Sequence, residues 1–275
     1  MSLLNIFYRL LPDFKGKQRL GRLIFRKQIK TISNITVKGR HNIVYRLPNL
    51  KENIGYEIFI NGIYEKETSS FIISKIPDGG IYIDIGANIG SIMLPVVKNK
   101  TNIKIICIEA SRSVYSYLEE NCRLNKLENI VLVNRALSDK DDMVMNFYSP
   151  KGQFGKGHFS NEVNEEIDRV ITIRLDTLLE KYTIAKPDFI KVDIEGYEYF
   201  AFKSAGNLLE DSSAPDFLFE FEDWAEGRVA GLKPGDAQSY LLEKGYKLFV
   251  LKRRRVERIT TPKLTGSAMI WATKK

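Results

Sequence analysis

Four acidic residues lie at or near the ends of apolar segments that are typical of buried β-strands. They are Asp84, Glu109, Asp193 and Glu220. In an open parallel sheet, ligands bind outside the carboxyl ends of the strands, where the strand order reverses. The sequence therefore predicts that these four carboxyl groups share one rim of an α/β sheet, where they could steer a cationic ligand or move a proton.

The first of these acids stands beside a glycine turn. Residues 81–85 are apolar apart from Asp84, and Gly86 and Gly90 follow before an amphipathic segment. This pattern indicates a strand, a tight turn that lets the backbone approach a cofactor, and a helix start with free N–H donors. A dinucleotide turn would need glycine where Asn88 and Ser91 stand. A carboxylate here suits the ammonium and sulfonium groups of S-adenosylmethionine; a turn without a ligand is the alternative.

Glu109 lies 23 residues after Gly86 and ends the next apolar segment. A carboxylate at that position can accept hydrogen bonds from both ribose hydroxyls of an adenosine. Enzymes that bind NAD and enzymes that bind S-adenosylmethionine both use it, so Glu109 predicts an adenosine without choosing between them. The alternative is an acid that ends a strand in solvent.

A third acidic group spans residues 191–198. Asp193 ends an apolar strand, where it could orient a cationic donor or accept a proton. Glu195 and Glu198 begin the following helix, whose exposed N–H groups favour anions, and helix capping alone accounts for Glu198. By strand alternation, Glu220 and Glu222 share a face. With Asp193 they could bind a divalent metal, but a half-buried strand with one wet face explains the pattern better, so a metal is possible but not favoured.

His158 is one of only two histidines and lies in a glycine-rich stretch, residues 155–160. A loop of this kind could carry the imidazole over the cleft, where a side chain with its ordinary pKa would serve as a general base. The alternative is a histidine on an exposed loop.

The elements that must position these residues alternate between strand and helix. From residue 81 onward we predict strands at 81–85, 103–108, 130–133, 189–192, 217–221, 246–251 and 268–273, and helices at 92–98, 111–125, 195–209 and 234–244. Such alternation is typical of a doubly wound, mostly parallel sheet. Residues 134–188 are predicted as a polar excursion. Before the sheet, residues 1–30 form one or two basic amphipathic helices, 35–60 alternate as short strands, and 67–76 form a helix.

Composition limits the class of protein. At 275 residues, with 44% hydrophobic and 28% charged residues, the chain can bury one large core. Cys107 and Cys122 are 15 apart, without metal-ligand spacing, which favours a reducing compartment over a disulfide or zinc framework. The apolar opening is interrupted by Arg9 and is too short to span a membrane. We expect a cytoplasmic protein.

The charge is concentrated near the N-terminus. Residues 1–40 hold ten Lys or Arg and one Asp, a balance of +9, so the remaining 235 residues of this +8 chain sum to −1. A second basic cluster lies at residues 252–255. A basic arm can bind nucleic acid or reach an anionic membrane at its inner face through residues 1–30. It can also be a helix packed on the sheet with its charges in water.

Three parts of the sequence resemble the FkbM-family methyltransferases, which bind S-adenosylmethionine. They are residues 62–65 with 83–90, residues 134–139, and residues 174–178 with 191–198. The resemblance implies an α/β class I (Rossmann-like) methyltransferase fold, with a seven-stranded, mostly parallel sheet whose last strand is antiparallel. It also implies methyl transfer to a hydroxyl of a sugar, glycan, polyketide or similar metabolite. We expect this domain at 76–275, after a small N-terminal α+β extension at 1–75.

Carried over residue by residue, the resemblance assigns a cofactor site. The methionine end would be lined by Asp84, Gly86, Ala87, Asn88 and Gly90, with Asp193 close by. Glu109 would hold the ribose, flanked by Ala110 and Ser111. Ser138 and Asp139 would border the adenine, and Tyr64 and Glu65 could close over the cofactor.

For proton removal from the acceptor, His158 is the first candidate, and Asp193 or Glu195 is the second. The loops at 150–167 and 223–233 would shape the acceptor pocket, with candidates Phe154, Phe159, Trp224 and Arg228.

Two other functions remain open. An RNA-directed methyltransferase would fit the basic arm, but the Asp/Asn-Pro-Pro-aromatic motif of base-methylating enzymes is replaced here by residues 193–197, which argues against nucleic acid. A non-enzymatic protein that binds the cofactor and docks on anionic lipid or a partner is the other.

Overall fold

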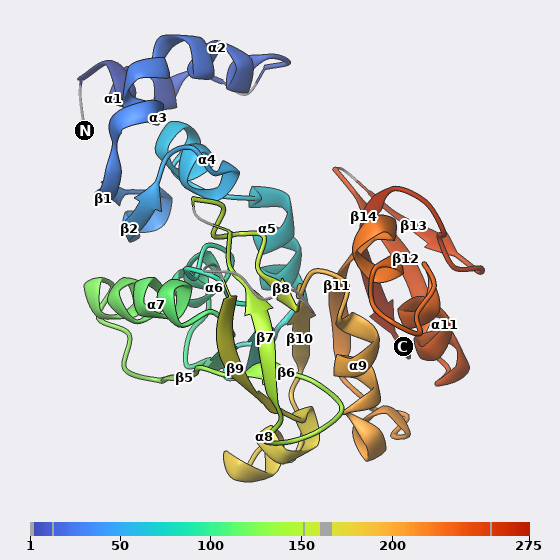
Figure 1. The fold of residues 1–275 in the computed structure, drawn as a ribbon. Helices are drawn as coiled ribbons and strands as arrows, with labels where there is room; N and C mark the ends of the chain where they lie inside the picture. Colours follow the sequence, from blue (N-terminus) through green and yellow to red (C-terminus); the bar gives the residue numbers. More distant parts are fainter. Residues whose placement is uncertain (1–2, 13, 151, 160–166, 254) are drawn as a thin grey trace.

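The computed structural model describes residues 3–12, 14–150, 152–159, 167–253 and 255–275. Its largest element is an eight-stranded sheet of order β13-β12-β14-β11-β10-β3-β4-β5 (Figure 1). The strands are β3 (Ile81–Ile85), β4 (Lys104–Ile108), β5 (Ile130–Val133), β10 (Phe189–Val192), β11 (Asp216–Glu222), β12 (Lys247–Lys252), β13 (Arg255–Ile259) and β14 (Ser267–Thr273).

Strands β5, β4, β3, β10 and β11 pair in parallel, and β14 inserts antiparallel between β11 and β12. These seven strands have the topology implied by the family resemblance. The eighth, β13, pairs antiparallel with β12 at the sheet edge, because the basic segment around residue 253 folds back as a hairpin. The strand order reverses between β3 and β10, so ligand binding is expected at their carboxyl ends.

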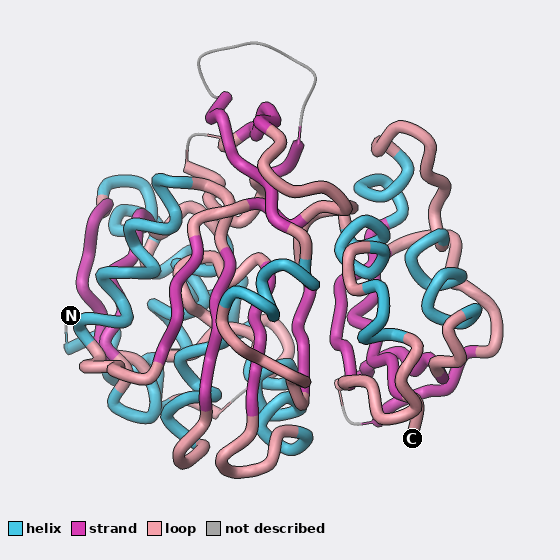
Figure 2. Tube along the Cα trace, turned by 90° about the horizontal axis from the view of Figure 1, so that it is seen from below, coloured by secondary structure: helices cyan, strands magenta, loops and turns pink. Residues whose placement is uncertain are grey.

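Helices cover both faces of this sheet (Figure 2). One face, with Tyr82, Ile105 and Phe189, packs in a core with α5 (Lys66–Lys75), α6 (Met93–Asn99) and α7 (Arg112–Leu124). The other face, with Ile83, Ile106 and Ile190, packs with α8 (Leu175–Lys181), α9 (Glu198–Lys203) and α11 (Asp236–Glu243). Strands buried on both faces are continuous apolar runs, which is why the sequence predicts them well.

Residues 134–188, predicted as a polar excursion, contain a second sheet of order β6-β9-β7-β8. Its strands are β6 (Ala136–Leu137), β7 (Val144–Tyr148), β8 (His158–Phe159) and β9 (Ile167–Ile173). They are half exposed, and apolar side chains such as Val144 and Ile171 face solvent, so the period-two signal is weak. This small sheet brings the segment between β7 and β8 to the rim of the large sheet.

The N-terminal extension contains α1 (Leu3–Leu10), α2 (Lys17–Ile24), α3 (Arg26–Thr31), β1 (Ser33–Lys38), η1 (Arg40–Asn42), β2 (Val44–Asn49) and α4 (Asn53–Asn61). The prediction of strands across 35–60 is wrong for α4. That helix buries Ile54, Tyr56, Ile58, Phe59 and Ile60, so it shows no apolar stripe in the sequence. Two short helical elements complete the fold, η2 (Gly206–Leu209) and α10 (Asp223–Gly227). Within the described ranges, no helix is long and apolar enough to cross a membrane.

Two asparagines of α7 hold the N-terminal extension against the eight-stranded sheet. Asn121 accepts a hydrogen bond from the Arg46 N–H and donates to the Ile89 carbonyl, and Asn125 bonds both backbone groups of Val44. The two amides thus take the place of a neighbouring strand beside β2. Tyr45 of β2 is completely buried in the same core as Tyr82 of β3.

Replacing Asn121 by Ala should lower the free energy of unfolding by about 2–3 kcal/mol, because it leaves buried backbone groups of Arg46 and Ile89 without partners. Urea denaturation measures this loss. The exposed Glu119→Ala change on the same helix is the control and should cost under about 0.5 kcal/mol. Equal stability of the two variants would contradict the bridging role.

Candidate functional site

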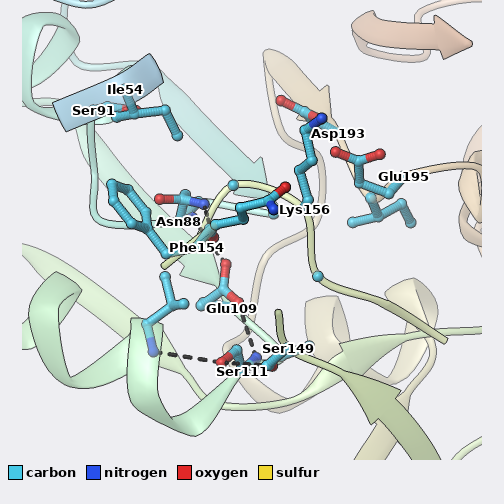
Figure 3. Close-up of a pocket in the computed structure, with 18 of the residues that line it drawn as sticks. Ile54, Asn88, Ser91, Glu109, Ser111, Ser149, Phe154, Lys156, Asp193 and Glu195 are labelled. Atoms are coloured by element: carbon cyan, nitrogen blue, oxygen red, sulfur yellow. Dashed lines mark hydrogen bonds between the residues drawn. The ribbon is translucent and has the colours of Figure 1, made fainter. Parts of the chain in front are cut away.

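A cavity of about 650 Å³ opens at the carboxyl ends of β3, β4, β10 and β11 (Figure 3). Its volume is in the range of small-molecule sites. The segment between β7 and β8 and the N-terminal end of α4 also form part of its wall. The cavity is therefore at the switch point of the large sheet, as the four strand-end acids predict.

The glycine turn packs directly on the exit of β10. Gly86 has φ +73, and a Cβ there would lie 1.8 Å from the Asp193 carbonyl oxygen, so only glycine fits. The Gly86 and Ala87 N–H groups both donate to the Ile108 carbonyl. The turn is thereby fixed between β4 and β10, with its backbone on the cavity wall.

Glu109 lies on the cavity wall with only 7% of its surface exposed. One carboxyl oxygen accepts from the Asn88 N–H at 2.9 Å and the other from the Ser111 N–H at 2.9 Å. Burial raises the pKa of Glu109 to about 7, although these two hydrogen bonds oppose the rise. Each oxygen keeps a lone pair for a further donor, such as a hydroxyl.

Ser111 caps α7 by accepting from the Val114 N–H, as expected, and also contacts the Ser149 hydroxyl at 3.2 Å. The Asn88 side chain donates to the Phe154 carbonyl at 2.8 Å. These bonds tie the β7–β8 segment to the start of α7 and to the glycine turn (Figure 3).

Asp84 does not line the cavity. It is fully buried, and Lys191 Nζ lies 3.3 Å from its carboxylate and 3.2 Å from that of Asp193. Burial raises the pKa of Asp84, and Lys191 opposes this. Burial alone would lower the pKa of Lys191, but Asp193 and Asp84 together raise it. The structure therefore places a lysine, not a ligand, against Asp84, and Lys191 is the residue that reaches the cavity.

The opposite end of the cavity from Ser111 is acidic. Asp193 and Glu195 both project there (Figure 3), and Glu65, Glu220 and Glu222 also line it. The Asp193 carboxylate, with burial, raises the pKa of Glu220 to about 10 and accepts its proton in a hydrogen bond. Burial, followed by Asp193 and Glu222, raises the pKa of Glu195 to about 7. The described residues that line the cavity include seven acidic side chains and three basic ones.

The possible metal ligands Asp193, Glu220 and Glu222 all line the cavity. Across the described ranges, no group of three or more His, Cys, Asp or Glu side chains is arranged so that it could hold a metal ion.

The cofactor candidates fall into two sets. Those on the cavity wall are Tyr64, Glu65, Gly86, Ala87, Asn88, Glu109, Ala110, Ser111 and Asp193, and the candidate base Glu195 lies there too. The wall omits Gly90, Ser138 and Asp139, and Arg135, Ala136 and Leu137 stand there instead. Asp139 turns toward α9, where Lys203 Nζ lies 3.4 Å from its carboxylate.

His158 is outside the cavity, while its neighbour Phe159 is on the wall. The two residues alternate along β8, so only one can face inward. The His158 ring packs against Tyr148, with 5.2 Å between centroids, and Phe159 packs on Tyr197 at 4.3 Å. The structure does not bring the first candidate base to the site.

The acceptor candidates Phe154, Phe159 and Trp224 line the cavity. Arg228 does not, but its guanidinium stacks 4.8 Å from the centre of the Trp224 ring and donates to the Glu195 carbonyl at 2.9 Å.

Two groups of residues that line the cavity were not predicted from the sequence as site residues. Lys191 could have been found from its spacing, because residues two apart on a strand share a face and Asp193 is on the site. Asn49, Glu52 and Ile54 come from the extension, and no local pattern marks them.

The chain is similar in sequence to a known protein family. The family model described as the methyltransferase FkbM domain matches residues 84–248. A curated relative, the tRNA(Phe) (4-demethylwyosine(37)-C(7)) aminocarboxypropyltransferase of Methanocaldococcus jannaschii, is 25% identical over 153 residues. The match covers 54% of this chain and 57% of that protein, so the chain spans little more than half the length of this relative.

Solved structures are similar at lower identity. The precorrin-6y C5,15-methyltransferase of Geobacter metallireducens has a TM-score of 0.45 and 13% identity, over 78% of this chain and 93% of that chain. The M. jannaschii TYW2 structure in complex with AdoMet has a TM-score of 0.41 and 15% identity, over 88% and 86%.

Replacing Lys191 by Met should lower the free energy of unfolding by about 3–5 kcal/mol, because it leaves the Asp84 charge buried without a partner. Chemical denaturation measures the loss. Adding Asp84→Asn removes the stranded charge, so the double variant should be more stable than Lys191→Met alone. Wild-type stability in the single variant would show that the ion pair does not hold the site.

Proposed function

The chain belongs to the FkbM methyltransferase family, and we propose that this S-adenosylmethionine-dependent methyltransferase methylates a hydroxyl group of a sugar, glycan or similar metabolite. The observation that carries the proposal is the polarity of the cavity. Glu109 stands at the nucleoside end, and the cluster around Asp193 and Glu195 stands at the other.

The residues present fit S-adenosylmethionine. The free lone pairs of the buried Glu109 carboxylate can take the ribose hydroxyls. Ile108, Val114 and Leu137 give the same part of the cavity an apolar wall suited to the adenine. The backbone of residues 86–88 would hold the methionine part. When bound, this cofactor supplies a methyl group activated by a sulfonium, whose positive charge suits the acidic end.

Glu195 is the group that we propose takes the proton from the acceptor hydroxyl. Its carboxyl lines the cavity, and its pKa of about 7 matches neutral pH. Asp193 is engaged by Lys191 at 3.2 Å and by the proton of Glu220, so it is less free to act as a base. The remaining acceleration would come from aligning the acceptor with the donor in a cavity that excludes water.

The acidic end also bears on the acceptor. Carboxylates repel phosphate and accept hydrogen bonds from hydroxyl groups, and Phe154, Phe159 and Trp224 add broad apolar surfaces. A neutral or cationic compound with several hydroxyls fits this wall.

RNA is a second candidate acceptor. The similarity to a tRNA-modifying relative and the +9 balance of residues 1–40 favour it, and the acidic cavity wall opposes it. Incubation with methyl-labelled cofactor and either total tRNA or extracted glycans separates the two. Label in the glycans supports the proposal, and label confined to tRNA overturns it.

Protonation of Glu109 should weaken nucleoside binding. Its pKa is raised to about 7, so the carboxylate is lost as pH falls through 7 and an acceptor for the ribose is lost with it. Affinity for 5′-methylthioadenosine should drop by about tenfold per pH unit below 7, measured by calorimetry. Glu109→Gln should bind weakly at every pH, with circular dichroism confirming its fold. A flat profile in the wild type would contradict this assignment.

Glu195→Gln should lower kcat by about 100-fold while affinity for S-adenosylhomocysteine stays unchanged, because only proton transfer is removed. Wild-type kcat should decline below pH 7, as Glu195 protonates. Glu222→Gln is the matched control: it removes no base, so kcat should stay near wild type, and the decline should move to lower pH because Glu222 helps to raise the pKa of Glu195. If Glu195→Gln keeps the wild-type kcat and pH profile, Glu195 is not the base.

A further inference from the structure

The first two helices carry an unusual share of the exposed apolar surface. Of the fifteen large hydrophobic side chains that are exposed in the described part of the chain, nine lie between residues 4 and 24. They are Leu4, Ile6, Phe7, Leu10, Leu11, Phe14, Leu20, Leu23 and Ile24. Figure 1 shows α1 and α2 at one end of the molecule, beyond α4. Such a concentration marks an interaction surface.

Helix α1 is attached through its polar side chains. Asn5 donates to the Phe59 carbonyl, and Arg9 donates to the carbonyls of Phe59, Ile58 and Lys38. The side chains opposite this polar face are the apolar ones, and Phe7 and Leu10 are 65% and 75% exposed. Tyr8 packs inward against Phe25, but Leu4, Ile6, Phe7 and Leu10 are exposed, so most of the described apolar surface of this helix faces out, whereas a surface helix usually packs its apolar face inward.

Helix α2 continues the apolar surface and adds charge beside it. Its buried residues are Lys17 and Gly21, while Leu20, Leu23 and Ile24 face out. Arg19 is four residues before Leu23, so the two are neighbours on the helix surface.

A second cavity, of about 970 Å³, adjoins this surface and is basic. It shares Phe14 and the start of α2 with the apolar surface. Six basic side chains line it, from four separate parts of the chain, against two acids. The six are Lys15, Lys17, Arg19, Arg40, Lys66 and Arg253. Arg253 belongs to the basic hairpin between β12 and β13, so the fold brings the two basic clusters of the sequence together.

We propose that α1 and α2 dock on an anionic lipid bilayer. The exposed apolar side chains enter the interfacial region, and the lipid headgroup phosphates lie against the basic cavity. Apolar surface and net positive charge on the same segment are the two contributions that hold peripheral helices at anionic membranes. The net charge of +9 in residues 1–40 is complementary to the negative charge of an anionic bilayer. An uncharged apolar partner would not require this positive charge.

Docking would bring the active-site cavity near the lipid surface. Tyr64 and Glu65 line the active-site cavity, and the next two residues, Lys66 and Glu67, line the basic one. The N-terminal end of α4 likewise lines the active-site cavity, while its Phe59 carbonyl holds α1.

Co-sedimentation of the full chain with lipid vesicles tests the proposal. The chain should bind phosphatidylcholine vesicles that contain phosphatidylglycerol and should release as salt rises, and it should not bind phosphatidylcholine alone. Phe7→Ser with Leu23→Ser should weaken binding at least about tenfold, because both side chains lose apolar burial. Lys15→Ala with Arg19→Ala should weaken it by about fivefold per residue.

Leu264→Ser, which removes an exposed apolar side chain elsewhere, and Lys126→Ala with Lys181→Ala are the matched controls and should bind as the wild type does. Affinity for S-adenosylhomocysteine, measured on each variant, shows that the fold is intact. No binding to anionic vesicles, or equal binding by the Phe7/Leu23 variant, would overturn the proposal. So would a lipid-free dimer that this variant dissociates, because the surface would then join two copies of the chain.

Discussion

The buried charge of Lys191 is the interaction on which the site depends. In the parallel register of β3 and β10, Lys191 stands beside Asp84, and two residues later Asp193 turns to the same ammonium. The charged groups of Asp84, Lys191 and Asp193 therefore link β3 to β10 at the point where the strand order reverses. Such a group is costly to bury and is stable only when complete, so it fixes where the exits of β3 and β10 lie. The close approach of Gly86 to the Asp193 carbonyl is possible because these exits are fixed.

From this centre the charges are distributed with a clear polarity. Glu109 is held by backbone N–H groups at the end of the cavity that we propose for the nucleoside, while Asp193, Glu195 and Glu220 gather at the other end. Their mutual repulsion and burial give Glu195 a pKa of about 7 and keep Glu220 protonated. The buried Lys191 does not balance all of these carboxyl groups, so the active-site cavity stays acidic, whereas six basic side chains line the second cavity against two acids.

Much of the large sheet could be predicted from the sequence because its strands are buried on both faces. The predicted strands at 81–85 and 189–192 match β3 and β10 residue for residue. Helix α4 and the small sheet could not be predicted in this way. The first is buried on all sides, and the second is half exposed, so neither shows a clean period. These two elements supply part of the cavity wall, including Ile54 and Phe159.

Residue types predicted the site better than side-chain directions did. Glu109, Asp193 and Glu220 lie on the cavity wall, as their strand-end positions suggest. The Asp84 carboxylate points to Lys191, and the sequence alone does not show which residue it pairs with. His158 lies on the opposite side of β8 from Phe159, and the sequence alone does not show which of the two faces the cavity.

A crystal structure with S-adenosylhomocysteine tests the account most directly. The account predicts the ribose hydroxyls on Glu109 and the sulfur toward Asp193 and Glu195, with Lys191 still between Asp84 and Asp193. A nucleoside bound in the reverse direction, or an Asp84 that leaves Lys191 to contact the ligand, would contradict it.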